Sequence, residues 1–161
     1  MAKKAKKAKA KQARQADAID LLKRDHAEVK KAFKDFEKAK YKDPKAGKEF
    51  LASICKAITL HAKLEEEIFY PAVRARIDDD DLMNEAQVEH NSAKQLIADI
   101  EKMAGDDPML KGTATVLAEY IQHHVREEEN EMFPKAKRLK LDLQGMAEQM
   151  LARKEELKGQ M

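Results

Sequence analysis

One pattern of residues occurs twice in the chain, and it constrains the fold more than any other feature. Residues 61–71 and 124–134 both read His-x-x-x-Glu-Glu-x-x-x-(Tyr/Phe)-Pro. A single histidine precedes each copy at nearly the same spacing. His26 lies 35 residues before His61, and His90 lies 34 residues before His124. The chain is therefore predicted to consist of two similar halves, and antiparallel packing would relate them by a pseudo-twofold axis.

Both copies lie in segments predicted to be amphipathic helices, because apolar residues and the four histidines recur at steps of three and four. The first helix begins near Asp17 and is broken by residues 41–47, and the second runs from about residue 46 to residue 77. Residues 78–81 supply a turn and an N-cap for the third helix, which Gly105 is expected to end. Asp107 and Pro108 are expected to start the fourth helix, and Pro71 and Pro134 to kink or end theirs.

Composition agrees with an all-helical fold. The 161 residues include only 5 Gly and 4 Pro, and aromatic residues make up 5%, which is too little turn-forming sequence for an all-β or doubly wound α/β fold. Residues 17–161 are therefore predicted to form an all-α, antiparallel up-down-up-down four-helix bundle. A short C-terminal helix over about residues 143–157 is expected to pack outside the bundle through Met146, Met150, Leu151 and Leu157.

The N-terminal end differs in charge from the rest of the chain. Residues 1–14 hold seven basic residues and no acid, so 25 of the 32 basic residues remain against 30 acidic ones in residues 15–161. Residues 1–16 are expected to be a disordered tail or a frayed helix. The tail either serves solubility or makes weak, non-specific nucleic-acid contact through residues 3–14, since it has no aromatic for base stacking.

Other features bear on the compartment. No segment approaches the length of an apolar membrane span, and no apolar region follows the basic start as in a secretory signal. Cys55 is the only cysteine, so no intramolecular disulfide is possible, and it is expected to be a buried thiol. These features predict a cytoplasmic protein, with its oligomeric state left open.

The repeated pattern predicts a metal site in the core. Residues four apart share one face of a helix, so His61 with Glu65 and His124 with Glu128 point toward the bundle interior. Burying unpaired carboxylates costs several kcal/mol, and bound cations compensate that cost. Imidazole and carboxylate donors without thiolate suit iron, manganese or zinc.

Several neighbouring residues have two interpretations. His123 lies about 100° around the helix from His124 and is expected to face outward. Four glutamates next to the predicted ligands either accept hydrogen bonds from the ligand imidazoles or are surface charge, and surface charge is favoured for most of them: Glu66, Glu67, Glu127 and Glu129. Tyr70 and Tyr120 are the nearby candidates for a proton or radical role, but a packing role is favoured for both.

These motifs resemble those of hemerythrin-like proteins of the HHE cation-binding type. The resemblance covers about residues 17–138 and rests on the following residues: Asp25-His26, His61-x-x-x-Glu65-Glu66 with Tyr70-Pro71, Glu89-His90, and His124-x-x-x-Glu128-Glu129 with Phe133-Pro134. It implies a non-haem di-iron centre with an oxo or hydroxo bridge inside the bundle. The implied metal ligands are His26, His61, Glu65, His90, His124 and Glu128.

One departure from the family bears on function. Oxygen-carrying hemerythrins have a fifth histidine where this chain has Lys94. Lys94 is expected either to face solvent, which is favoured, or to lie near an open coordination position. The resemblance implies a metal-binding protein that binds or senses iron, dioxygen or nitric oxide. The alternative is a di-iron enzyme that acts on peroxide or nitric oxide.

Overall fold

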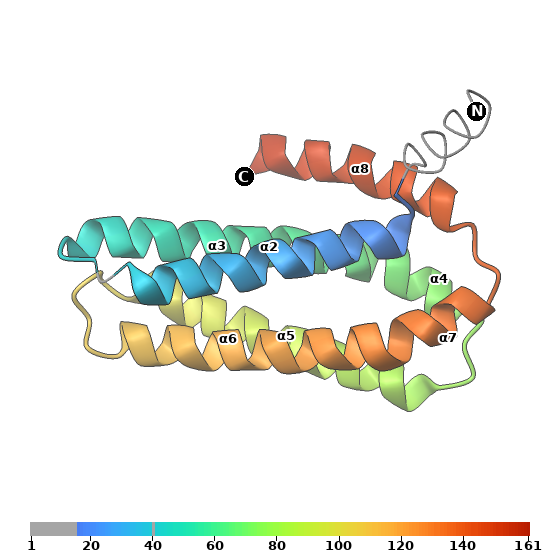
Figure 1. Cartoon of the computed structure of the whole chain (residues 1–161), viewed down its shortest axis with the longest axis horizontal. Coiled ribbons are helices and arrows are strands. Elements are labelled where there is room, and N and C mark those ends of the chain that lie inside the picture. The colour runs from blue at the N-terminus through green and yellow to red at the C-terminus, as the bar shows by residue number, and fades with distance from the viewer. Residues whose placement is uncertain (1–15, 40) are drawn as a thin grey trace, which may run out of the picture.

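A computed structural model describes residues 16–39 and 41–161, and the described part is helical throughout apart from its turns. The tail predicted for residues 1–16 lies almost entirely outside the described residues. The two halves of the bundle are α2 (Ala18–Lys38) with α3 (Pro44–Leu64), and α5 (Asp80–Lys102) with α6 (Leu110–Glu127). Figure 1 shows these long helices lying along the long axis of the molecule in alternating directions, which confirms the predicted antiparallel bundle.

Aspartates start most of these helices. The side chain of Asp17 accepts a hydrogen bond from the backbone N–H of Asp20, and the side chain of Asp20 accepts one from the N–H of Asp17, which completes a capping box. Asp43 caps α3 ahead of Pro44, and Asp79 caps α5 by accepting from the N–H of Leu82 at 3.2 Å, as the sequence predicted for residues 78–81.

Two predicted helix ends are wrong. The third helix stops at Lys102, before Gly105, because the Lys48 ammonium donates to the backbone carbonyls of Ile100 and Met103. Gly105 is needed for another reason, since a Cβ there would lie 2.4 Å from the carbonyl oxygen of Pro44. The fourth helix begins at Leu110, because Asp107 caps the preceding turn by accepting from the N–H of Met109.

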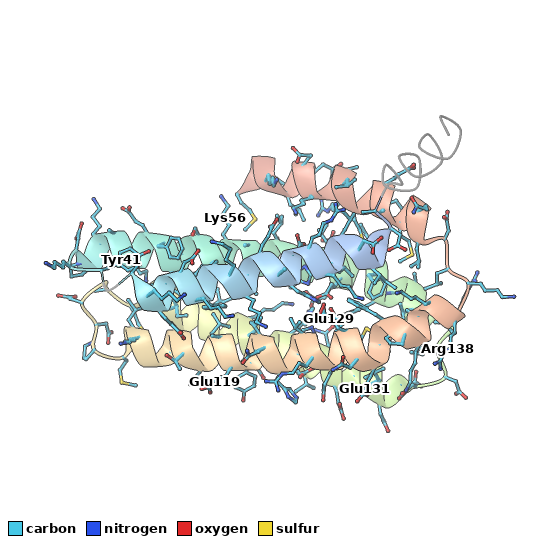
Figure 2. The ribbon with its side chains drawn as sticks, viewed as in Figure 1. Tyr41, Lys56, Glu119, Glu129, Glu131 and Arg138 are labelled. Atoms are coloured by element: carbon cyan, nitrogen blue, oxygen red, sulfur yellow. The ribbon has the colours of Figure 1, made fainter. Side chains whose placement is uncertain are left out.

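The C-terminal helix α8 (Leu143–Gln160) packs against α2 and α3 and is longer than predicted. It buries Met146, Met150 and Leu157, whereas Leu151 is exposed. Lys56 of α3 donates to the backbone carbonyl of Met161 at 2.9 Å (Figure 2), which holds the end of α8 on α3. The helix therefore covers the α2–α3 hairpin, and among residues 16–39 and 41–161 no equivalent helix covers the α5–α6 hairpin.

The core falls into two hydrophobic clusters. One contains Phe69, Met132 and Phe133 with residues of α8, and the other contains Val29, Ile58 and Ile97 toward the α2–α3 and α5–α6 turns. The predicted metal ligands lie between the two clusters. None of the helices in residues 16–39 and 41–161 is long and apolar enough to cross a membrane.

Candidate metal centre

Each copy of the repeated pattern contains a π-helical turn that begins at its glutamate. These turns are η1 (Glu65–Phe69) and η2 (Glu128–Met132), and they continue into α4 (Tyr70–Arg74) and α7 (Phe133–Arg138). The structure shows that neither proline ends its helix. Proline lacks an N–H and its ring crowds the carbonyl four residues earlier, and the turn directly before each proline-containing segment is π-helical. Such turns are frequent at functional sites.

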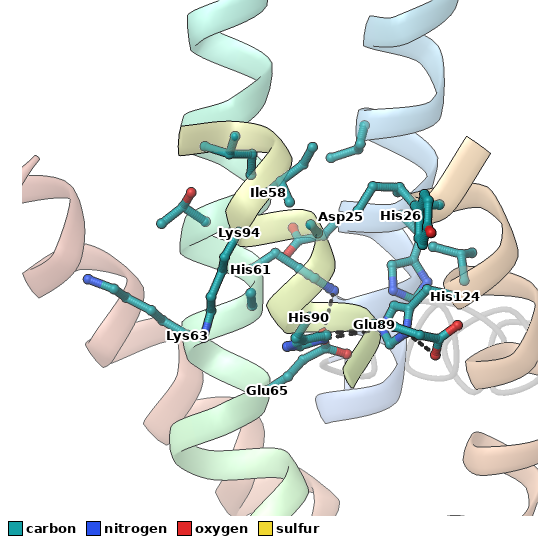
Figure 3. Close-up of a pocket in the computed structure, with 18 of the residues that line it drawn as sticks. Asp25, His26, Ile58, His61, Lys63, Glu65, Glu89, His90, Lys94 and His124 are labelled. Atoms are coloured by element: carbon teal, nitrogen blue, oxygen red, sulfur yellow. Dashed lines mark hydrogen bonds and ion pairs between the residues drawn. The ribbon is translucent and has the colours of Figure 1, made fainter. Parts of the chain in front are cut away.

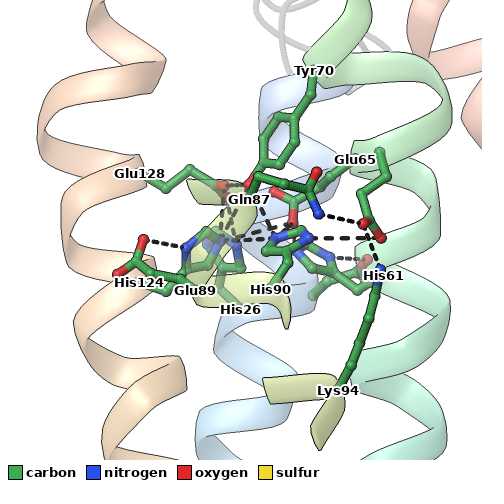
Figure 4. A network of polar contacts seen from close by, with 12 residues as sticks. His26, His61, Glu65, Tyr70, Gln87, Glu89, His90, Lys94, His124 and Glu128 are labelled. Carbon is green, nitrogen blue, oxygen red and sulfur yellow. Dashed lines mark hydrogen bonds and ion pairs between the residues drawn. The ribbon is translucent and has the colours of Figure 1, made fainter. Parts of the chain in front are cut away.

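The structure brings the six predicted ligands together from the four long helices and the two π-helical turns (Figure 4). Their donor atoms form two groups, within each of which all donor atoms lie within 4.8 Å of one another. One group is His26, His61, Glu65 and Glu128, and the other is Glu65, His90, His124 and Glu128. The two glutamates therefore belong to both groups, as bridging ligands of a two-metal site would.

A second carboxylate orients one histidine in each half. Asp25 lies 2.9 Å from Nδ1 of His61, and Glu89 lies 3.0 Å from Nδ1 of His124. Each acid directly precedes the lone histidine of its half, so the pseudo-twofold relation extends to these contacts. A carboxylate at Nδ1 directs the lone pair of Nε2 toward the cluster, which is the usual arrangement of metal-binding histidines.

Two of the glutamates predicted as surface charge also face ligand histidines. Glu66 lies 3.8 Å from Nδ1 of His90, and Glu129 lies 3.7 Å from Nδ1 of His26. The other two match the surface interpretation, because Glu67 pairs with Arg153 of α8 and Glu127 with the exposed His123. At these distances neither glutamate accepts a hydrogen bond from the imidazole, so a supporting role of Glu66 and Glu129 stays a prediction.

Tyr70 belongs to the site and is more than a packing residue. Its buried hydroxyl donates to Glu128 and lies 3.1 Å from Nε2 of His90 and 3.2 Å from Nε2 of His124. Burial and the charges of Glu128 and Glu65 hold its pKa well above the ordinary value, so the hydroxyl keeps its proton. The equivalent residue in the other half is Phe133, which stacks on the ring of His26 without offering a hydroxyl.

Without metal, protonated histidines balance the buried carboxylates. Burial disfavours the imidazolium of His61, but Glu65 and Asp25 outweigh this effect and raise its pKa to about 10. In the same way, Glu128 and Glu89 raise the pKa of His124, and the nearby histidines hold the pKa of Glu128 well below its ordinary value. A cation must displace these protons, so cation binding should release protons and weaken as the pH falls.

Unsatisfied polar atoms test whether the cluster suits a metal. Among the described residues, every buried side-chain nitrogen or oxygen without a hydrogen-bond partner belongs to five of the six predicted ligands: His26, His61, Glu65, His90 and Glu128. Buried polar atoms are normally paired, since leaving one unpaired costs about 1–3 kcal/mol. The donor set therefore fits a pair of cations, which would satisfy the unpaired oxygens of Glu65 and Glu128 and one ring nitrogen each of His26 and His61.

The remaining predicted positions lie where expected. The side chain of His123 is 63% exposed and faces Glu89 and Glu127 at 3.4 Å, away from the cluster. Lys94 is 52% exposed and pairs with Glu66 at 2.6 Å. Cys55 is buried, and desolvation raises the pKa of its thiol to about 11, which makes it unreactive.

The charges around the two halves differ. On the α8 side, the ammonium of Lys154 lies 3.2 Å from Asp25, which contacts His61. On the opposite side, Glu89 contacts His124 through one oxygen and faces the exposed His123 through the other. The positive charge of Lys154 therefore acts on one half of the cluster only.

A model of the hemerythrin HHE cation-binding domain matches residues 17–136. The chain belongs to this family. The matched region contains all six predicted ligands and both π-helical turns, so the resemblance inferred from the motifs is confirmed. Family membership supports cation binding by this HHE domain, and the His and Glu groups of the structure could hold the cations.

Two relatives place the HHE domain among known proteins. It is 32% identical over 114 residues to a DNA nickase of Nostoc sp. (strain PCC 7120 / SAG 25.82 / UTEX 2576), and the match covers 71% of this chain but 32% of the nickase. The chain thus spans about a third of that relative. The chain also resembles the crystal structure of a hemerythrin HHE cation-binding domain-containing protein from Mycobacterium kansasii, with a TM-score of 0.77 and 21% sequence identity. The match covers 91% of this chain and 90% of that one, so the two proteins share a fold.

Proposed function

We propose that the HHE domain binds two iron ions as a non-haem di-iron centre and uses it to bind or sense iron, dioxygen or nitric oxide. The observation that carries the proposal is the pair of four-residue donor groups that share Glu65 and Glu128. His26 and His61 would complete one position, and His90 and His124 the other. When bound, the ions supply one-electron redox chemistry and coordination positions for a small ligand.

The donor set supports iron but also accepts other metals. Imidazole and carboxylate suit iron, manganese and zinc, and no thiolate takes part because Cys55 belongs to the apolar cluster nearer the turns. Lys94 holds Glu66 where oxygen carriers have a fifth histidine, which favours sensing or binding over dioxygen transport. A cytoplasmic location stays a prediction.

A cobalt titration of the metal-free protein tests the proposal. Co²⁺ should bind with a stoichiometry of two per chain and should develop visible bands of nitrogen and oxygen ligation. Binding should release protons, because the raised pKa values of His61 and His124 keep these imidazoles protonated until a cation displaces the protons. One cobalt per chain, or none, would contradict a two-metal site.

Lys154 gives a prediction about the two metal positions. Glutamine at position 154 keeps a hydrogen-bond donor to Asp25 but removes the positive charge, so the half containing His61 should bind cations more tightly. In the wild type, the metal position in that half should be the second to take up a cation. Lys154→Gln should therefore raise the cation affinity of the weaker binding step about two- to five-fold. Competition with a chelator measures both steps.

The control for this prediction is Lys158→Gln, since Lys158 lies on the same helix and its ammonium pairs with Glu155 at 3.6 Å rather than with Asp25. It should leave both steps unchanged. Equal changes in the two variants would show that net charge, rather than the contact with Asp25, sets the affinity.

Tyr70 favours one second candidate function, an enzyme that acts on peroxide. Its protonated hydroxyl lies within the cluster, where it would hold a proton for transfer to a peroxide substrate. Tyr70→Phe should then keep the metal content while peroxide consumption falls about 100-fold, the usual contribution of a proton donor. Tyr120→Phe is the control, because that side chain is exposed. An unchanged rate in Tyr70→Phe would remove the enzyme candidate.

The basic tail gives a separate prediction about partners. A relative is named a DNA nickase, and residues 1–14 of this chain carry seven basic residues. We propose that residues 3–14 make weak, non-specific contact with nucleic acid. Deleting residues 2–14 should abolish retention on a DNA column at low salt, because release of counterions drives such binding. Retention that is equal with and without the tail would contradict this role.

A further inference from the structure

A cavity of about 260 Å³ adjoins the metal cluster inside the bundle (Figure 3). The histidines and glutamates of the cluster form one wall. Apolar side chains from all four long helices form most of the rest, among them Val29, Ile58, Ala93, Ile97 and Ile121. The cavity thus extends from the donor atoms into the apolar cluster nearer the α2–α3 and α5–α6 turns.

The size of the cavity exceeds the need of a diatomic gas. One water takes up about 30 Å³ of the liquid, and an engineered apolar cavity of about 150 Å³ binds benzene. A cavity of about 260 Å³ therefore has room for a molecule at least as large as benzene. Native cores are close-packed, so a void of this size beside a functional cluster calls for an occupant.

The lining favours an apolar occupant. Several of its charged groups already have partners, because Asp25 lies 2.9 Å from His61, Glu89 lies 3.0 Å from His124 and Lys94 pairs with Glu66 at 2.6 Å. Apolar surface covers nearly all of the remaining wall, which favours burial of hydrocarbon.

We infer that this cavity binds a small neutral apolar molecule, aromatic or branched, with a single polar group directed at the His–Glu cluster. Exposed lining residues, Lys63, Lys94 and Tyr120, mark where the cavity meets solvent, so the molecule can enter without unfolding of the bundle. The inference rests on the proposed function only for the contact between the molecule and the metals. It makes an apolar organic molecule, rather than a gas alone, a ligand of the centre.

Fluorine NMR with fluorobenzene as the probe tests this inference on the full chain. Fluorobenzene should bind the zinc-loaded protein with one site per chain. Ala93→Leu fills the cavity from α5 and should weaken binding at least tenfold. The matched control is Ala98→Leu, on the same helix but outside the cavity lining, which should bind as the wild type does. Equal binding by the two variants, or none by the wild type, would overturn the inference.

A second cavity-filling variant and a cobalt-loaded sample complete the test. If Ala93→Leu does not fold, Ile121→Phe fills the cavity from a half-buried position on α6 and should give the same loss. In cobalt-loaded protein, the bound fluorine should show a paramagnetic shift relative to the zinc form. Failure to bind cobalt would contradict the di-iron proposal alone, whereas bound cobalt with no shift of the probe would contradict the cavity site alone.

Discussion

Replacing His124 with alanine should remove at least one of the two bound metal ions, whereas replacing its neighbour His123 should remove none. His124 places Nε2 within the donor group, 3.1 Å from Glu128, and Glu89 holds its other nitrogen. His123 differs in sequence position by one residue but is exposed and points away. Metal analysis of the two purified variants measures the difference.

His61→Ala should reproduce the loss in the other half, because His61 and His124 occupy equivalent positions in the repeat. Circular dichroism should show that the three variants retain their helices. If His123→Ala lost metal while His124→Ala kept it, the assignment of the inward face of α6 would be wrong, and the second donor group would have to be rebuilt around position 123.

Removing the metal ions should lower the melting temperature strongly. A ligand that binds only the folded state, present at 1,000 times its dissociation constant, stabilises that state by about 4 kcal/mol. Two such ions would contribute about 8 kcal/mol, which corresponds to a shift of roughly 15–30 °C for a domain of this size. The reason is local, because without metal only imidazolium protons offset the charges of the buried Glu65 and Glu128, and three of their four oxygens have no hydrogen-bond partner.

Thermal unfolding of the metal-loaded and chelator-treated protein measures this shift, and His124→Ala should fall between the two. The tail-deleted chain is a suitable control, because residues 2–14 precede every described helix and hold no predicted ligand. A melting temperature that does not change after verified metal removal would contradict a role of the ions in stabilising the core.

The helical halves and the convergence of six side chains could be predicted because both follow from spacing. His61 and Glu65 share a helix face, and the repeat places their counterparts His124 and Glu128 at equivalent positions. The structure brings these residues together with His26 and His90. Metal ligation by the six residues stays a prediction, since it depends on an ion that the spacing does not identify.

The contacts around the ligands could not be predicted, because they depend on which helices face one another. Asp25 and His61 lie on different helices, as do Glu89 and His124. A signal was present, since an acid precedes the lone histidine in both halves. The π-helical turns themselves could not be predicted, because proline indicates either a kink or an end of the helix, and tertiary packing decides that the helix continues through a π-helical turn.

Tyr70 was misjudged for a related reason. The repeat aligns it with Phe133, which suggests a shared packing role, and both rings do pack beside a ligand histidine. Only the structure shows that the extra hydroxyl of Tyr70 reaches Glu128, His90 and His124. The difference between tyrosine and phenylalanine at equivalent positions was the available signal. The hydroxyl of Tyr70 and the charge of Lys154 make two halves of similar sequence chemically unequal.

Metal analysis combined with a visible spectrum of protein purified aerobically from iron-replete cells tests the di-iron centre most directly. We predict about two irons per chain and the near-ultraviolet and visible charge-transfer bands of a bridged di-ferric centre. A folded helical protein that carries a single zinc ion, or no metal, would contradict the di-iron centre. It would instead indicate that the replacement of the fifth histidine by Lys94 accompanies a loss of that function.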